Sequence, residues 1–296
     1  MIDSDSKFEQ ITKGARAIFN PEVFQYVKTV SQEIWNEPNN VMTFSDIDSF
    51  KYNYFDMIKQ YKHSTLLGLD DFKDIVITDG VTGAFLDWYI EYGKENLVVL
   101  KGEYPFHERN GITVIDSYVE LQKGQTLILS TPFSATGNIH ADYYSIMEWC
   151  NNNSVNVLID AAYLNISGIG ELPVSQKCVK SVATSLSKVY NTGMNKIGLK
   201  FNKEETHTPY KQLNDWSYVN HHSINLHNKI MEKFSLSYIY DSYKDKQIDF
   251  CDKLGLLVSS TVIFGLSTED KYKQFNRSDL INRLCISKEL QNATST

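Results

Sequence analysis

A lysine that closely follows two serines is the residue of this chain best suited to covalent chemistry. Ser185 and Ser187 precede Lys188 in the segment SLSKVYNTGMNK, and Lys196 comes eight residues after it. A lysine amine attacks a carbonyl only when it is unprotonated, and burial near another cation lowers its pKa enough to allow this. We therefore interpret Lys188 as the covalent attachment point of a cofactor whose phosphate contacts both serines and Lys196. The alternative is a solvated polar turn.

A glycine turn in the segment TDGVTGAF, residues 78–85, is a second candidate for phosphate binding. Gly80 would lead directly into a helix that starts with Val81 and Thr82. Backbone N–H groups at a helix start are free to bind a phosphate. Glycine before a helix is also common for purely structural reasons, so this segment alone is weak evidence.

An aromatic residue before a proline, in the segment GEYPFH, follows a predicted strand. Tyr104 next to Pro105 would be held rigidly at the mouth of a sheet, where its ring could stack on a flat ligand. Taken alone, the ring could equally fill the loop as a structural plug.

An aspartate ends another apolar strand, in the segment VLIDAAYLNISG. Burial of the Asp160 carboxylate would be costly without a partner, and a protonated ring nitrogen is such a partner. Tyr163 could donate a hydrogen bond to a phenolic oxygen of the same ring. In the alternative, Asp160 only caps the following turn.

Short apolar runs alternate with helical patterns and predict the elements that would position these residues. The runs have the length and composition of strands buried on both faces, and they are DIVITD, NLVVLK, QTLILS, VNVLID, SVATS and KIGLKF. Residues 81–92 and 141–153 show helical spacing of apolar groups. Strands that alternate with helices predict an α/β layered fold with mostly parallel pairing. Ligands bind at the carboxyl ends of strands in such sheets, where the four segments fall.

The two ends of the chain have a different pattern. Residues 1–62 are predicted to be mostly helical, with FNPEVFQYVKTVSQEIW as an amphipathic helix. Residues 222–255 are predicted to be a long helical region. Two strands, LLVSSTVIF and NRLCIS, are expected after it. We therefore expect a small helix-and-strand domain packed against the large sheet.

The composition predicts a soluble cytoplasmic protein. The 296 residues are 42% hydrophobic with a net charge of −7, and no basic stripe indicates nucleic acid. No apolar run approaches the ~18 residues of a membrane span, and the first ten residues do not resemble a signal peptide. The four cysteines form no CxxC pair, and the histidines have no metal-ligand spacing. We therefore expect no metal, disulfide framework or membrane contact.

Together, the four segments resemble the fold type I pyridoxal phosphate enzymes, the aspartate aminotransferase superfamily (class I/II aminotransferases). The resemblance extends from about Ile75 to Phe201 and more loosely to the C-terminus, in an unusually short chain. It implies a three-layer PLP-transferase-like large domain at residues 63–225 with a mixed, mostly parallel sheet. A reduced α+β small domain at 226–296 would follow. Residues 1–62 would belong to the small domain or to a dimer contact.

By position, the resemblance implies a role for each site residue. Lys188 would form the Schiff base, Asp160 would pair with the pyridine nitrogen, and Tyr163 would contact the ring hydroxyl. Tyr104 would stack on the ring. The residues implied at the phosphate are Val81, Thr82, Ser185 and Lys196. STPFSATGNIH resembles the family's Asn-Pro-x-Asn-Pro-Thr-Gly loop and places Ser134 at the ring-hydroxyl asparagine. NRLCIS resembles the C-terminal strand whose arginine, here Arg283, would bind the substrate carboxylate; otherwise Arg283 would form a surface ion pair.

The chain also departs from this family's pattern. Lys196 stands where the family has an arginine. An arginine can bind a phosphate through two parallel N–H groups, whereas a lysine offers one compact ammonium charge. Ser134 is shorter than asparagine. The family's glycine-containing segment before the first strand is not evident, and WNEPNNVMTFSDIDSF does not replace it.

The resemblance implies a PLP-dependent aminotransferase that acts on an amino acid by α-proton abstraction, as a homodimer. Two alternatives remain open. One is a PLP-dependent lyase, decarboxylase or cyclase, which the shortened small domain would allow. The other is a catalytically weak binding protein that keeps the fold, and the presence of Lys188, Asp160 and Tyr163 argues against it.

Overall fold

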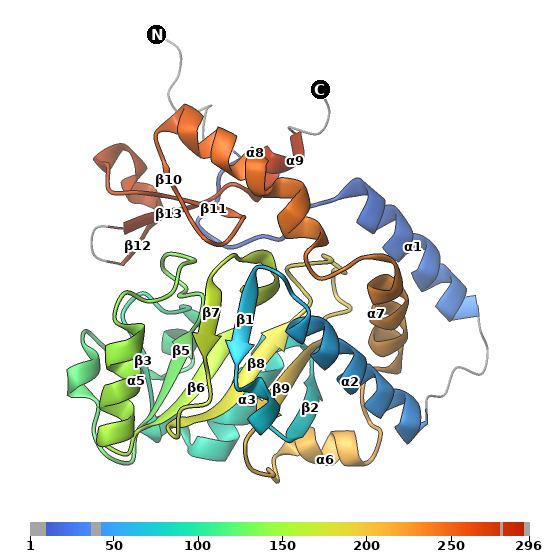
Figure 1. The fold of residues 1–296 in the computed structure, drawn as a ribbon, viewed down its shortest axis with the longest axis horizontal. Coiled ribbons are helices and arrows are strands. Elements are labelled where there is room, and N and C mark those ends of the chain that lie inside the picture. Colours follow the sequence, from blue (N-terminus) through green and yellow to red (C-terminus); the bar gives the residue numbers. More distant parts are fainter. Residues whose placement is uncertain (1–9, 37–42, 279–280, 293–296) are drawn as a thin grey trace.

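A seven-stranded sheet forms the centre of the protein in the computed structural model, which describes residues 10–36, 43–278 and 281–292 (Figure 1). In spatial order, its strands are β2 (Asp74–Thr78), β9 (Gly198–Asn202), β8 (Val179–Ser185), β6 (Asn156–Ala161), β5 (Thr126–Ser130), β3 (Leu97–Leu100) and β4 (Thr113–Ile115). Each of the six runs predicted as strands of this sheet is confirmed. The short edge strand β4 is an addition.

The sheet is mixed, as expected, because β9 runs against its neighbours. β8, β6, β5, β3 and β4 pair in parallel, whereas β9 pairs antiparallel with both β8 and β2. Parallel strands require a long crossover, usually a helix, whereas a short connection reverses the chain. Residues 186–197, which join β8 to β9, contain no helix, and β9 returns beside β8 in the opposite direction.

The central strands bury both faces, as their continuous apolar composition predicts. Successive side chains point to opposite faces of a strand. Val99, Ile128 and Leu158 lie in a core beneath α3, and their neighbours Val98 and Leu127 lie in the larger core on the other face.

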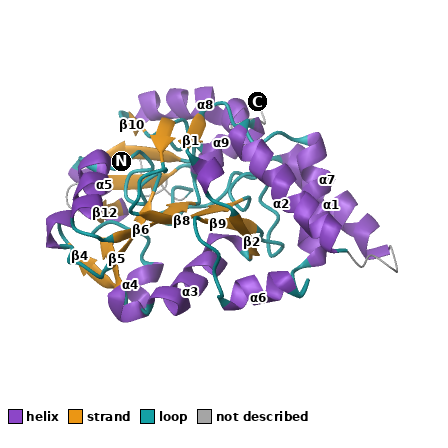
Figure 2. Cartoon of the chain, turned by 60° about the horizontal axis from the view of Figure 1, so that its bottom comes forward, coloured by secondary structure: helices purple, strands orange, loops and turns teal. Residues whose placement is uncertain are grey.

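Helices cover both faces of the sheet. α3 (Gly80–Tyr92), α4 (Phe106–Arg109) and α6 (Pro209–Asp215) lie together on one side (Figure 2). The other helices of the large domain and of the N-terminal part are α1 (Pro21–Asn36), α2 (Phe44–Lys59), α5 (Tyr143–Asn152) and α7 (His221–Lys233). The helices predicted at 81–92 and 141–153 are confirmed within two residues at each end. None of the described helices is long and apolar enough to span a bilayer.

A second, antiparallel sheet lies beyond the carboxyl ends of the large sheet, in the orange and red part of Figure 1. Its strands are β10 (Leu257–Val258), β11 (Phe264–Ser267), β13 (Ile281–Cys285) and β12 (Asn276–Ser278), and the nearby helices are α8 (Tyr238–Leu254) and α9 (Ser287–Asn292). The predicted strand NRLCIS corresponds to β13. A small parallel pair, β1 (Ser64–Leu67) with β7 (Gly170–Pro173), is not evident from the sequence.

The expectation of one strand over residues 256–264 is wrong. Residues 259–263 separate β10 from β11, because their polar groups bind a loop of the large domain instead of a strand partner. The Ser259 hydroxyl donates to the Thr136 carbonyl at 2.8 Å, and the Thr261 amide donates to the Gly137 carbonyl at 3.1 Å. The helical region expected at 222–255 is likewise interrupted at residues 234–237, where the buried Phe234 has extended backbone.

An extended segment, residues 10–20, precedes α1 and is called the N-terminal strap below. It runs between the two sheets toward α1 (Figure 1). Thr12 forms a backbone bridge with Cys285 of β13, with N···O distances of 3.1 and 2.9 Å. The strap is therefore attached to the small sheet while it passes the large one. The predicted N-terminal helical part is confirmed at α1 and α2 but not at residues 10–20, which form no helix; its residues 1–9 and 37–42 lie outside the described residues.

Candidate functional site

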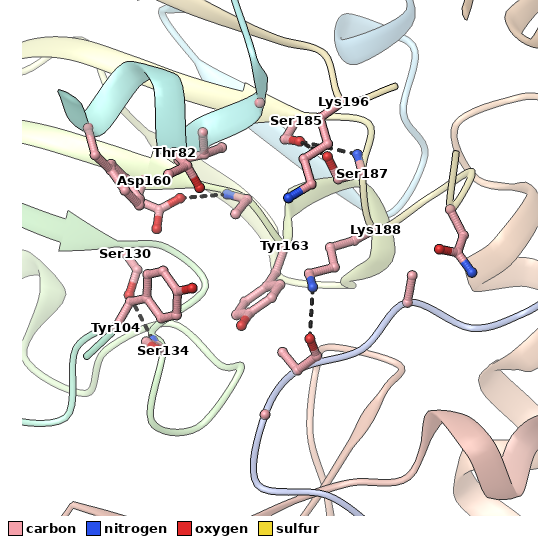
Figure 3. A pocket seen from close by; sticks show the side chains of 18 of the residues that line it. Thr82, Tyr104, Ser130, Ser134, Asp160, Tyr163, Ser185, Ser187, Lys188 and Lys196 are labelled. Carbon is pink, nitrogen blue, oxygen red and sulfur yellow. Dashed lines mark hydrogen bonds between the residues drawn. The ribbon is translucent and has the colours of Figure 1, made fainter. Parts of the chain in front are cut away.

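A cavity of about 400 Å³ lies at the carboxyl ends of the large-sheet strands. Every residue that the sequence predicts for the site lines this cavity: Gly80, Val81, Thr82, Tyr104, Ser134, Asp160, Tyr163, Ser185, Ser187, Lys188, Lys196 and Arg283. The segments are far apart in the chain, and they meet because parallel strands end at the same edge of a sheet. Figure 3 shows Asp160, Tyr163, Lys188 and Lys196 reaching the same space from different segments.

The start of α3 and the serine loop form a small polar cradle. Gly80 has a φ of +70°, and an added Cβ would lie 3.3 Å from the Ser185 Oγ and 3.4 Å from the Ser187 Oγ. The Ser185 hydroxyl donates to the Ser187 Oγ at 2.9 Å, and the Ser187 amide donates to the Ser185 Oγ at 3.1 Å. Hydroxyls, a helix N-terminus and the nearby Lys196 favour an anion in this cradle.

The Asp160 side chain is 5% exposed at the end of β6. Burial raises the pKa of its carboxyl to about 7. The Ala162 amide donates to its Oδ1 at 2.9 Å, so the turn-capping role is present in the structure. Among the described residues, no cation lies within ion-pair distance of this carboxyl. A cationic ligand group would therefore stabilise the ionised form.

The Lys188 amine lies inside the cavity and donates to the carbonyl of Ala15 at 2.9 Å (Figure 3). Burial lowers the pKa of this lysine, and the nearby cations of Lys196 and Arg283 lower it further. A lowered pKa increases the fraction of neutral, nucleophilic amine. The environment expected for Lys188 is therefore present.

Two tyrosines extend into the cavity from different segments. Tyr104 is 44% exposed, and its ring stacks on Phe106 with a centroid distance of 5.9 Å and an interplanar angle of 12°. Tyr104 lines the cavity, so its ring is available to a ligand and does not simply fill its own loop. The Tyr163 ring packs edge-on against Phe264 at 5.3 Å. Burial raises the pKa of Tyr163, which keeps its hydroxyl protonated as a donor.

Arg283 is 2% exposed and lies over the Phe264 ring, with its Cζ 4.3 Å from the centroid. Its Nη1 donates to the Ser134 carbonyl, and its Nη2 donates to the Lys13 carbonyl at 3.0 Å. The alternative of a surface ion pair is wrong, because the side chain is buried in the cavity wall.

Sequence reasoning missed the N-terminal strap as part of the site. Gly14, Ala15 and Ala17 line the cavity, and the Ala15 carbonyl accepts from Lys188. The only signal was the glycine in TKGARAIFNP, before a helix that was itself predicted.

Glu103 and Arg277 were also missed. Glu103 is buried and accepts hydrogen bonds from the lining residue Ser130, and Arg277 lines the cavity from β12. A glutamate before the predicted aromatic residue, in GEYPFH, could have drawn attention to this position. Arg277 lies in a polar segment between the two predicted C-terminal strands, and no pattern marked it. The other lining residues that sequence reasoning missed are Asp79, Phe85, Ser130, Ala162, Asn191 and Gly193.

Several solved structures share this fold. A PLP-bound C–S lyase from Staphylococcus hominis, complexed with L-cycloserine, has a TM-score of 0.66 and 14% identity, covering 94% of this chain and 85% of its own. A probable N-succinyldiaminopimelate aminotransferase from Thermus thermophilus has a TM-score of 0.67 and 13% identity, covering 95% and 94%. A tyrosine aminotransferase from Leishmania infantum has a TM-score of 0.62 and 12% identity, covering 94% and 90%.

No protein-family model matches the chain, and no curated protein matches it by sequence. The structural likeness extends over nearly the whole chain. The predicted fold, a PLP-transferase-like large domain with a small α+β part, is therefore confirmed.

Proposed function

We propose that this protein is a PLP-dependent aminotransferase that acts on an amino acid. One observation supports this most strongly: Lys188, Asp160 and the Gly80–Ser185–Ser187 cradle meet in one cavity. These groups match an aldehyde, a protonated ring nitrogen and a phosphate, which pyridoxal phosphate carries on one molecule. The aminotransferases among the structures of the same fold add to this support.

Each residue of the cavity would have a distinct task toward this cofactor. The cradle and Lys196 would bind the phosphate, and the Tyr104 ring would stack on the cofactor ring. The Asp160 carboxylate would keep a proton on the ring nitrogen. Tyr163 would donate to the ring hydroxyl. Ser134 lies at the expected asparagine position, although its hydroxyl accepts from Arg277 at 3.3 Å.

When bound, pyridoxal phosphate withdraws electrons from the α-carbon of an amino acid. Lys188 would attach the cofactor and, once its Nζ is released by the substrate amine, accept the α-proton at that atom. Burial lowers the pKa of Lys188, which increases the fraction of neutral amine able to accept a proton. Arg283 would hold the substrate carboxylate through the N–H groups that its two carbonyl partners leave free.

The covalent step can be tested by borohydride reduction. Protein incubated with pyridoxal phosphate should turn yellow, and reduction followed by peptide mass spectrometry should locate the cofactor on Lys188. The Lys188→Ala variant should lose this adduct. Lys177→Ala, which changes an exposed lysine, should keep it. A colourless wild-type protein that gains no adduct at saturating cofactor would rule out the proposal and favour a binding protein.

A lyase is the second candidate, because a C–S lyase shares the fold. Both reactions start with removal of the α-proton, so the cavity supports either. Amino transfer needs a keto-acid acceptor, whereas a lyase releases ammonia and keto acid without one. Product analysis of an amino-acid panel with and without added keto acid therefore separates them.

We also propose a homodimer with its contact near the Lys196 side of the cavity. Met194 is 91% exposed in the loop that contains the lining residues Gly193 and Lys196. Trp216 and Tyr218 are 61% and 72% exposed, and Tyr218 lines a second cavity together with Lys196. Sedimentation velocity should show a dimer that Met194→Glu weakens, whereas Tyr144→Glu, at an exposed tyrosine on α5, should not. A wild-type monomer at micromolar concentration would contradict this.

The domain limits 1–62, 63–225 and 226–296 and the cytoplasmic location remain proposals. The antiparallel sheet with α8 and α9 supports a separate small domain at the C-terminal end.

A further inference from the structure

Two arginines line the cavity, and both contact Ser134. Arg277 Nη2 donates to the Ser134 hydroxyl at 3.3 Å, and Arg283 Nη1 donates to the Ser134 carbonyl. Both arginines come from the small sheet, from the neighbouring strands β12 and β13. Two guanidinium groups therefore lie at the same end of the cavity.

No ion pair compensates these two cations within the described part of the chain. Among residues 10–36, 43–278 and 281–292, no carboxylate forms an ion pair with either arginine, and both Nε atoms are buried without a hydrogen-bond partner. Burial and the charge of Arg283 lower the pKa of Arg277 to about 10, so Arg277 remains cationic at neutral pH. Uncompensated like charges in a buried site are unfavourable, and a bound anion would offset them.

Glu103, a carboxyl whose charge would act on Arg277, is engaged elsewhere. The carboxyl of Glu103 accepts hydrogen bonds from the Ser130 amide and hydroxyl, and burial raises its pKa to about 8. At neutral pH this carboxyl is therefore largely protonated and offers Arg277 little compensation.

The position of Arg277 is fixed by close packing of β12 on the large domain. Gly102 has a φ of +96°, and an added Cβ there would lie 2.9 Å from the Ser278 Cβ and 3.0 Å from the Ala135 Cβ. The glycine thus allows β12 to lie against the loops that present Tyr104 and Ser134. Arg283 already donates to two carbonyls. Among the residues that the structure describes, the Arg277 guanidinium donates only to the Ser134 hydroxyl, so most of its N–H groups remain for a ligand.

We propose that Arg277 binds a second carboxylate of the substrate, which makes the substrate an acidic amino acid. This inference rests on the proposed function, in which Arg283 binds the α-carboxylate. A guanidinium fork matches a planar carboxylate in bidentate geometry. The cofactor and the substrate would share a cavity of about 400 Å³. This space favours a side chain as short as that of aspartate or glutamate.

The contact between Arg277 and a second carboxylate can be tested without turnover, by comparing the binding of dicarboxylic and monocarboxylic acids that lack an amine. Calorimetry on the protein with pyridoxal phosphate should show succinate or glutarate binding at least tenfold more tightly than butyrate. Arg277→Gln should abolish this preference, and Arg277→Lys should retain part of it. Arg109→Gln, which changes an exposed arginine on α4, should leave it unchanged. Equal affinity of wild type for diacid and monoacid would overturn the inference.

Turnover provides the second test. Wild type should use aspartate or glutamate with a kcat/KM at least 100-fold above that for asparagine or glutamine. Arg277→Gln should lower the value for the acids at least 30-fold and change that for the amides less than threefold. An equal loss for both would identify a structural role and refute the inference. A wild type that binds the cofactor and prefers neutral amino acids would refute it while leaving the proposed function intact, whereas absence of the borohydride adduct would refute both.

Discussion

The Glu103 carboxyl accepts two hydrogen bonds from Ser130, from the backbone amide at 2.6 Å and from the hydroxyl at 2.5 Å. Ser130 Oγ in turn accepts from the Ser134 amide at 2.8 Å, and Glu103 also accepts from the Tyr104 amide at 3.2 Å. One buried acid thereby connects the loop after β3 with the loop after β5. It fixes the relative positions of Tyr104 and Ser134.

We expect Glu103→Ala to destabilise the fold by about 2–4 kcal/mol, because it leaves the buried Ser130 amide and hydroxyl without acceptors. Glu103→Gln keeps an acceptor and should cost less. Urea unfolding measures both, with Glu108→Gln at the exposed surface as the control. Equal stability of wild type and Glu103→Ala would show that the connection between the loops contributes nothing.

In the protein without cofactor, Asp160 and Glu103 should each lower the stability as the pH rises from about 4 to 8, whereas His107 and His227, whose pKa burial lowers to about 4, should raise it between about pH 4 and 6.5. Burial raises the pKa of Asp160 to about 7 and that of Glu103 to about 8, so the folded state retains protons that the unfolded state has released. Stability decreases wherever the folded state binds more protons, by at most about 1.4 kcal/mol per pH unit for each group.

The Asp160→Asn variant should lack the Asp160 part of this decrease. The urea midpoint of wild type should therefore decrease relative to that of Asp160→Asn as the pH rises from 4 to 7. Added pyridoxal phosphate should remove this relative decrease, because a cationic ring nitrogen keeps Asp160 ionised. Parallel profiles for wild type and Asp160→Asn without cofactor would contradict the assignment.

Gly80→Ala should weaken pyridoxal phosphate binding at least tenfold. Alanine is strained at a φ of +70°, and its Cβ would lie 3.3 Å from the Ser185 Oγ in the cradle. Gly111→Ala is a matched control, because its φ is +83° and nothing lies within 4 Å of an added Cβ. Fluorescence titration should show weakened binding for the first variant alone. Similar losses in both variants would indicate a general cost of strain.

Lys196→Gln should weaken binding of pyridoxal phosphate about 10–100-fold, because it removes the cation next to the cradle. Binding of pyridoxal, which lacks the phosphate, should change less than threefold. Lys196→Arg should bind the phosphate form at least as well as wild type. Absorbance titration with both vitamers distinguishes a phosphate contact from a general effect on the cavity, in which case both affinities would fall together.

Much of the fold could be predicted because its central strands are local, uninterrupted apolar runs. The proximity of Asp160 and Lys188 could be predicted from the sequence, because the carboxyl ends of parallel strands meet at one edge of a sheet. The split between β10 and β11 could not, since the polar groups of Ser259–Thr261 bind a loop more than 120 residues away in the chain.

The site residues that sequence reasoning missed also depend on contacts between segments that are distant in the chain. Arg277 reaches the cavity only because β12 packs against Gly102, and the strap reaches it through a bridge between Thr12 and Cys285. Such contacts depend on the packing of distant segments, and no short pattern in the chain encodes them.

The N-terminal strap gives Lys188 and Arg283 oxygen partners from within the protein itself, the carbonyls of Ala15 and Lys13. Attachment of a cofactor aldehyde to the Lys188 Nζ would therefore break the hydrogen bond to the Ala15 carbonyl. A measured cofactor affinity would then be the difference between the new bond and the hydrogen bond that is lost. Loosening the strap by changes remote from every reacting atom would alter that difference while leaving the chemistry itself untouched.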